Sequence, residues 1–187
     1  MKYSFLIIAL FTIALNSTAQ LKFPETDKSP LDVSYYPVNY PLLKIQGKAS
    51  EPLIARVIYS RPQKNNRVVF GELIEYDKVW RLGANEATEI EFFQNVKVGD
   101  HKIKKGRYTL YCIPTAEKWT LIFNRDTDSW GAFVYDAKKD VARADVTVEK
   151  TATVTESFSI CFEKNNGSFN LNIGWDSVKV TLPIYLQ

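Results

Sequence analysis

Apolar and polar residues alternate along most of the chain from Pro52 onward. The alternation is one-sided in three runs, residues 145–149, 169–176 and 178–184. Because successive side chains of a strand point to opposite faces, this pattern predicts strands with one buried face. Residues 53–58 are apolar on both faces, except for Arg56, which predicts a central strand.

Turn residues separate these runs at short intervals. Asn165-Asn166-Gly167 lies between two of them, and Asn and Gly tolerate the positive φ of tight hairpin turns. Many short strands joined by turns predict an all-β fold with a single antiparallel β-sandwich, either jelly-roll-like or immunoglobulin-like. Only residues 136–143, DAKKDVAR, could form a short helical turn.

Residues 1–19 have the pattern of a signal peptide. Lys2 precedes an apolar run that ends at Leu15, and small residues at Ser17 and Ala19 predict cleavage after Ala19. The run is shorter than the roughly 20 residues of a membrane-spanning helix. A lipoprotein would need a cysteine at the cleavage site, and this sequence has none there. We therefore expect an exported protein, periplasmic or secreted, with no membrane span in the mature chain.

The next segment, residues 20–41, contains four prolines. Proline lacks a backbone N–H and disfavours the interior of helices and central strands. We therefore expect a proline-rich N-terminal arm, followed by the β-sandwich domain over residues 42–187. The mature length of 168 of the 187 residues suits one domain.

Charge excludes some partners. The chain has 24 basic and 21 acidic residues, so its formal charge of +3 falls to +2 without Lys2. Such a small charge gives no electrostatic basis for binding nucleic acid or an anionic membrane.

Two cysteines, Cys112 and Cys161, would be exported to a compartment where disulfides form. The strand pattern places Cys161 on the polar face with the serines, opposite Phe158 and Ile160, which disfavours a bridge. Their pairing stays open at the level of sequence.

Familiar catalytic and metal motifs are missing from the sequence. The single histidine, His101, lies in a turn-like stretch, so no imidazole is paired with a nucleophile and no zinc ligand set is present. Residues 124–128 begin like a calcium loop, but Ser129 replaces the required glycine and Tyr135 the required glutamate. We predict no catalytic residues, no metal site and no cofactor.

A group of polar and aromatic residues is the best candidate for a binding site. Arg61 follows a predicted strand, and Arg81, Asn85 and Glu86 surround a glycine in WRLGANEAT. Arginine offers a planar fork of donors for a carboxylate or phosphate, and aromatic faces favour sugars. The candidate lining residues are Arg61, Arg81, Asn85 and Glu86, with Tyr59, Trp80 and Trp130 as walls.

Three functions and one structural alternative are compatible with this group. The first function is non-catalytic binding of a small polar or anionic ligand or a carbohydrate, as an envelope accessory protein. The second is a hydrolase of carbohydrate or ester that uses Glu86 or an aspartate. The third is a module that pairs with an envelope protein through an edge strand or the tyrosine-containing arm. Alternatively, an internal network of Arg–Glu pairs and of Asn85 with the backbone only stabilises the loop.

Four blocks, YSRP (59–62), FGELIEYDKVWRLGANEAT (70–88), KKGRYTLYCIP (104–114) and WGAFVYD (130–136), resemble the exported bacterial family known as Domain of Unknown Function 2911. The resemblance extends from about Pro30 to Ile184. It implies a secreted or periplasmic β-rich domain and assigns no catalytic residues.

Overall fold

A computed structural model describes residues 21–187, which form ten strands, one short α-helix and one 3₁₀ turn. The signal peptide predicted for residues 1–19 lies outside the described residues. The first five strands are β1 (Leu31–Tyr36), β2 (Ala55–Ser60), β3 (Glu89–Phe92), β4 (Val96–Val98) and β5 (His101–Ile103). The others are β6 (Gly106–Pro114), β7 (Lys118–Asn124), β8 (Asp140–Thr147), β9 (Glu149–Asn165) and β10 (Ser168–Leu186).

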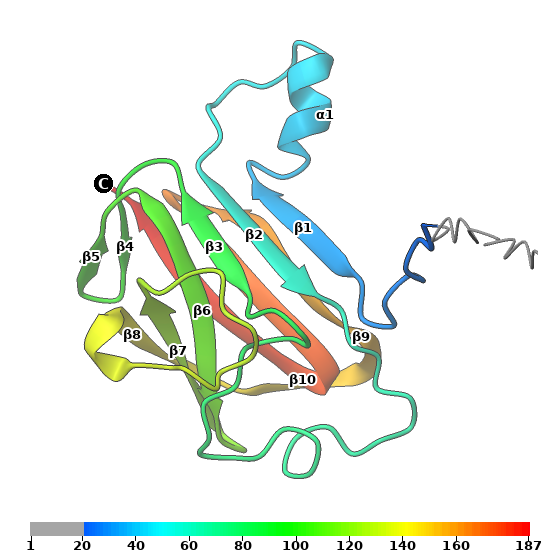
Figure 1. The fold of residues 1–187 in the computed structure, drawn as a ribbon. Coiled ribbons are helices and arrows are strands. Elements are labelled where there is room, and N and C mark those ends of the chain that lie inside the picture. Colours follow the sequence, from blue (N-terminus) through cyan, green and yellow to red (C-terminus); the bar gives the residue numbers. More distant parts are fainter. Residues whose placement is uncertain (1–20) are drawn as a thin grey trace, which may run out of the picture.

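The strands form two antiparallel sheets that pack face to face (Figure 1). The larger sheet has the order β1-β2-β3-β6-β7-β8, and the smaller has the order β5-β4-β10-β9. The sheets approach each other along both sides, because β1 lies beside β9 and β8 lies beside β5 and β10. This arrangement confirms the predicted all-β sandwich.

The edge strand β1 comes from the segment predicted as an arm. It pairs antiparallel with β2 from Leu31↔Ser60 to Tyr36↔Ala55. Tyr36 is buried and its ring stacks on Phe169 of β10, with ring centroids 4.2 Å apart. The sandwich therefore begins at Leu31, inside residues 20–41, and the prolines do not interrupt β1 because Pro30 precedes it and Pro37 follows it.

The short helix α1 (Tyr40–Ile45) was not expected, since the prolines argue against a helix interior. Pro41 lies in its first turn, where a missing N–H breaks no helical hydrogen bond. The 3₁₀ turn η1 (Ala137–Lys139) lies within the helical turn predicted for residues 136–143. No helix in residues 21–187 is long and apolar enough to cross a membrane.

The core lies between the sheets and is rich in aromatic rings at one end. Trp80 packs edge to face on Trp119 of β7, at 5.8 Å between centroids, and stacks on Trp175 of β10, at 6.1 Å. Phe158 of β9 joins the same cluster. Each such pair adds roughly 0.5–1.5 kcal/mol beyond the area it buries, so this cluster ties the two sheets together.

Strand β2 is an interior strand of the six-stranded sheet, between β1 and β3, as its apolar residues predicted. Ala55, Val57 and Tyr59 are buried, whereas Arg56 and Ile58 are partly exposed on the opposite face. Elsewhere on that outer face, loop residues such as Val79 and Ala132 pack over the buried Tyr111 and Ile122.

The two cysteines are not bonded to each other. Cys112 of β6 is buried in the core, and Cys161 of β9 is exposed on the outer face, as the alternation predicted. Burial raises the pKa of the Cys112 thiol well above its ordinary value, which further suppresses its reactive thiolate.

We predict that iodoacetamide modifies one thiol of the folded protein and both thiols in denaturant. Cys161 is reached from solvent, whereas Cys112 has no accessible surface. Intact-mass measurement counts the modified thiols, and Cys161→Ser is the control that should leave the folded protein unlabelled. Rapid labelling of Cys112 in the folded state would contradict the packing described here.

Candidate functional site

The connection between β2 and β3, residues 61–88, covers one end of the sandwich (Figure 1). It is fixed to β6 by two backbone hydrogen bonds, in which the Trp80 N–H donates to the Cys112 carbonyl at 2.7 Å and the Cys112 N–H donates back at 2.9 Å. The Leu110 N–H donates to the Thr88 carbonyl at 2.8 Å. The WRLGANEAT segment therefore lies along β6 as an irregular continuation of β3.

The backbone turns sharply after Arg81. Leu82 has a φ of 55°, a left-handed conformation that costs an ordinary residue roughly 1–2 kcal/mol. The Thr88 hydroxyl donates to the Leu82 carbonyl at 2.5 Å, and the Thr88 N–H donates to the Arg81 carbonyl at 3.0 Å. These bonds hold the strained turn and fix the backbone that carries Arg81.

Gly83 approaches the end of β2 too closely for a side chain. A Cβ at this position would lie 3.0 Å from the Ser60 Oγ and 3.3 Å from the Ser60 carbonyl oxygen. The Ser60 hydroxyl accepts a hydrogen bond from the Ala84 N–H at 2.8 Å, and the Trp80 indole donates to the Gly83 carbonyl at 3.0 Å. A side chain at Gly83 would therefore force Ser60 to shift, and the φ of 157° at this position also favours glycine.

A cleft of about 480 Å³ opens beside this turn. One side consists of residues of the β2–β3 connection, including Ile74, Trp80 and Arg81. Phe133 from the β7–β8 connection and Trp175 of β10 also line the cleft. The volume lies within the range of small-molecule sites.

Arg81 is the most unusual residue of the cleft. Its side chain is half-buried, its Nε is sealed from solvent, and its guanidinium forms no hydrogen bond or ion pair with any of residues 21–187. Burial lowers the pKa of the guanidinium, although an arginine keeps its proton at neutral pH. An unpaired buried N–H costs about 1–3 kcal/mol, so the fold tolerates an unfavourable cation here.

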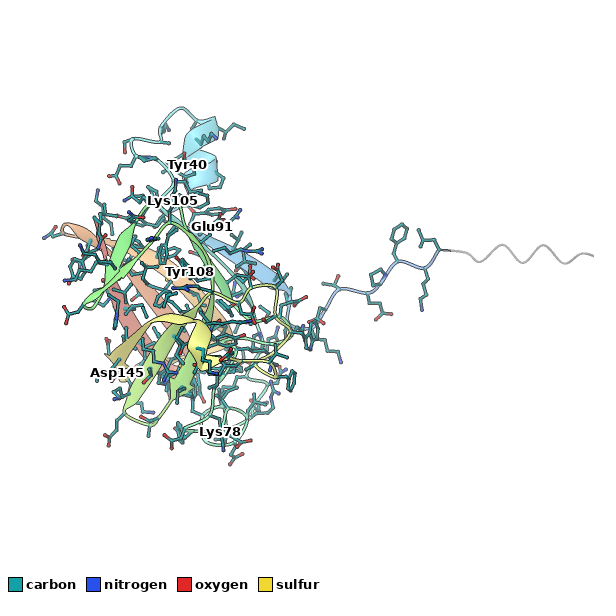
Figure 2. The ribbon with its side chains drawn as sticks, turned by 60° about the vertical axis from the view of Figure 1, so that its left-hand side comes forward. Tyr40, Lys78, Glu91, Lys105, Tyr108 and Asp145 are labelled. Carbon is teal, nitrogen blue, oxygen red and sulfur yellow. The ribbon has the colours of Figure 1, made fainter. Side chains whose placement is uncertain are left out.

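The rim of the cleft has a net positive charge. Arg67 and Lys78 line it together with one acid, Glu75, and all three side chains are exposed. Lys78 lies at the end of the molecule opposite Tyr40 of α1 (Figure 2). With Arg81 inside, the cleft presents three cations and one anion, a charge pattern complementary to an anionic ligand.

The model of the family described as "Protein of unknown function (DUF2911)" matches residues 43–184. The chain belongs to this family. Searches of curated proteins and of solved structures returned no match. The DUF2911 match includes the whole β2–β3 connection and excludes β1.

Arg61 of this DUF2911 protein lies in a structural network outside the cleft. Its guanidinium donates to the Asp32 carboxylate at 2.9 Å, to the Ser159 hydroxyl at 2.9 Å and to the Phe158 carbonyl at 3.2 Å. Tyr59 donates weakly to the same Asp32, at 3.4 Å. These contacts join β1, β2 and β9, so Arg61 is paired internally, but with Asp32 rather than with Glu86.

The other three predicted residues also lie outside the cleft. The Asn85 amide donates to the Asp27 carboxylate at 3.0 Å. Glu86 is exposed, forms a backbone bridge with the exposed Trp130, and lines a smaller cavity of about 290 Å³ with Glu89. Of the seven predicted residues, the structure therefore brings only Trp80 and Arg81 to the cleft.

Sequence reasoning missed several lining residues. Lys78 and Phe133 lie within the blocks FGELIEYDKVWRLGANEAT and WGAFVYD, so the resemblance contained a signal for both. Arg67 lies between the first two blocks, and Trp175 resembles any other core residue of an alternating strand. Only the packing of β10 against Trp80 shows that Trp175 reaches the cleft.

The two weak chemical motifs have ordinary surroundings. His101 is exposed at the start of β5. In the calcium-like stretch, the Asn124 amide donates to the Asp140 carboxylate at 2.7 Å, and its carbonyl oxygen accepts from the Asp126 N–H at 2.9 Å. Asn124 therefore serves as a buried connector between β7 and the following turn.

We predict opposite stability effects for the two arginines. Arg61→Ala removes three hydrogen bonds between strands and should lower the free energy of unfolding by about 1–2 kcal/mol. Arg81→Met removes an unpaired buried donor and keeps an apolar side chain of similar length. It should raise the free energy of unfolding by up to about 1 kcal/mol. Urea unfolding followed by tryptophan fluorescence measures both.

Arg125→Met provides the matched control, because Arg125 is exposed and lies outside the cleft. It should change stability by less than about 0.5 kcal/mol. A loss of stability in Arg81→Met as large as that in Arg61→Ala would show that Arg81 has a structural role.

Proposed function

We propose that this protein is an exported ligand-binding domain that holds a small molecule through an anionic group placed beside Arg81. The signal-peptide pattern of residues 1–19 supports export. The observation that supports binding is the unpaired, half-buried guanidinium on the wall of a cleft large enough for a small molecule.

The energetics favour an anion as the missing partner. A cation partly removed from water is less favourable unless a negative group compensates it, and no carboxylate of residues 21–187 forms an ion pair with Arg81. A carboxylate or a phosphate oxygen matches the planar fork of arginine. Binding would therefore recover the free energy that folding leaves unfavourable at this residue.

A neutral sugar is less well supported by the same cleft. Sugar sites present an aromatic face to the ligand. Trp80 and Trp175 are only 6% and 1% exposed, because their rings pack against each other in the core. Phe133 is the one ring of this cleft with a large exposed area, so a sugar would find a single aromatic face, whereas an anion would find the unpaired guanidinium.

The hydrolase hypothesis depends on carboxylates, and the cleft is lined by a single one, the exposed Glu75. Glu86 lies in the smaller cavity described above, with Glu89 and Asp128. The Glu89 carboxylate is within 3.4 Å of Arg107 and accepts a hydrogen bond from the Asp128 N–H at 2.7 Å. These contacts support a role of Glu89 in an electrostatic network rather than in catalysis. We therefore propose the binding hypothesis and not the hydrolase hypothesis.

Binding of the fluorescent probe 8-anilinonaphthalene-1-sulfonate tests the proposal. The mature protein should bind the probe, and Arg81→Met should weaken binding at least tenfold, because the sulfonate loses its counter-charge while the apolar wall remains. Fluorescence titration gives both dissociation constants. Raising the salt concentration should weaken binding to the parent protein more than to the variant.

Arg125→Met again serves as the control and should bind the probe like the parent. Equal affinities of the parent and Arg81→Met, with both proteins folded, would reject Arg81 as an anion-binding residue.

A further inference from the structure

The cleft has a charged inner wall formed by one residue. Arg67, Glu75 and Lys78 are exposed at its rim, whereas Arg81 is half-buried beside the buried Trp80. A single negative charge balances one interior guanidinium. A second negative charge beside Arg81 would face only Arg67 and Lys78, whose exposed charges are screened by water and stabilise it less.

Backbone donors on the same wall are partly occupied. The Ala84 N–H donates to the Ser60 hydroxyl at 2.8 Å and is not free for a ligand. Phosphate sites in proteins combine several backbone N–H groups with cations, often in a nest of successive amides. This wall therefore suits a carboxylate better than a phosphate dianion.

Exposed apolar side chains from two connections, β2–β3 and β7–β8, line the cleft. Leu73 is 41% exposed and Phe133 is 84% exposed, and both lie at the same cleft as Arg81. Each Å² of apolar surface removed from water is worth roughly 25 cal/mol. A ligand with a hydrocarbon or aryl body would bury both side chains, whereas a small inorganic anion would leave them exposed.

The ring of Phe133 packs over the backbone of Gly131 in its own loop. Gly131 has a φ of 68°, and a Cβ there would lie 2.6 Å from the Phe133 ring. The Gly131 N–H donates to the Asn85 carbonyl at 2.9 Å, which ties this loop to the turn that carries Arg81. The aromatic side and the cationic side of the cleft are thus joined by a backbone hydrogen bond.

We infer that the ligand is an amphiphilic monocarboxylate, with its carboxylate beside Arg81 and its apolar body against Leu73 and Phe133. This inference rests on the proposed anion-binding function and narrows its ligand class. Arg81 would bind the carboxylate, whereas Leu73 and Phe133 would bind the apolar body. The two contacts can therefore be tested by separate variants.

The experiment compares four probes by isothermal titration calorimetry at pH 7.5: 4-phenylbutyrate, its neutral amide, acetate and phenyl phosphate. Phenylbutyrate should bind at least tenfold more tightly than each of the other three. The amide lacks the charge, acetate lacks the apolar body, and phenyl phosphate carries close to two negative charges at this pH.

Two variants separate the contributions. Arg81→Met should reduce the preference for phenylbutyrate over its amide to less than threefold, while the affinity for the amide stays within threefold of the parent. Phe133→Ala should weaken phenylbutyrate at least threefold and leave acetate unchanged. Val134→Ala is the control, because Val134 is 65% exposed and lies outside the cleft.

The outcomes distinguish this inference from the proposed function. If phenyl phosphate bound more tightly than phenylbutyrate, and Arg81→Met lost that binding, the ligand would not be a monocarboxylate. Arg81 would still be an anion-binding residue. Equal affinities for acetate and phenylbutyrate would contradict the inference that an apolar part of the ligand contacts Leu73 and Phe133. Failure of every anion, including the anilinonaphthalene sulfonate, would overturn the proposed function and this inference together.

Discussion

Burial of the Trp80 indole is the interaction on which the rest of the site depends. The ring lies between the two sheets, stacked on Trp175 of β10 and edge-on to Trp119 of β7. Its backbone is bonded to Cys112 of β6 in both directions. Because Trp80 cannot move without opening the core, the next residue, Arg81, is held at the cleft. A long surface connection thereby gains the rigidity of the sandwich beneath it.

The two arginines that share a sequence neighbourhood have different physical roles. Arg61 is satisfied by Asp32, Ser159 and a backbone carbonyl, and it connects three strands. Arg81 has no such partner among residues 21–187. A paired arginine is explained by the fold, whereas an unpaired, half-buried one is a cost that the fold alone does not explain. The cleft beside Arg81, rather than the network around Arg61, is therefore the candidate binding site.

The cleft is also prearranged, which is a feature expected of binding sites. The left-handed Leu82, the close approach of Gly83 to Ser60 and the Thr88 hydrogen bonds all lie within a few residues of Arg81. Strain of this kind persists only where surrounding contacts over-determine the backbone. A backbone held in advance loses little conformational freedom when a ligand arrives, so more of the interaction energy appears as affinity.

The sequence by itself determined the all-β class, the outward position of Cys161 and the helical turn near residue 137. These features are local, because strand parity and turn residues are written in neighbouring positions. Only the tertiary structure decided that β1 belongs to the sheet, that Arg61 pairs with Asp32, and that Phe133 and Trp175 meet Arg81 at one cleft. These contacts join residues far apart in the chain, and their formation depends on strand order and on the packing of two sheets, which alternation in one segment does not specify.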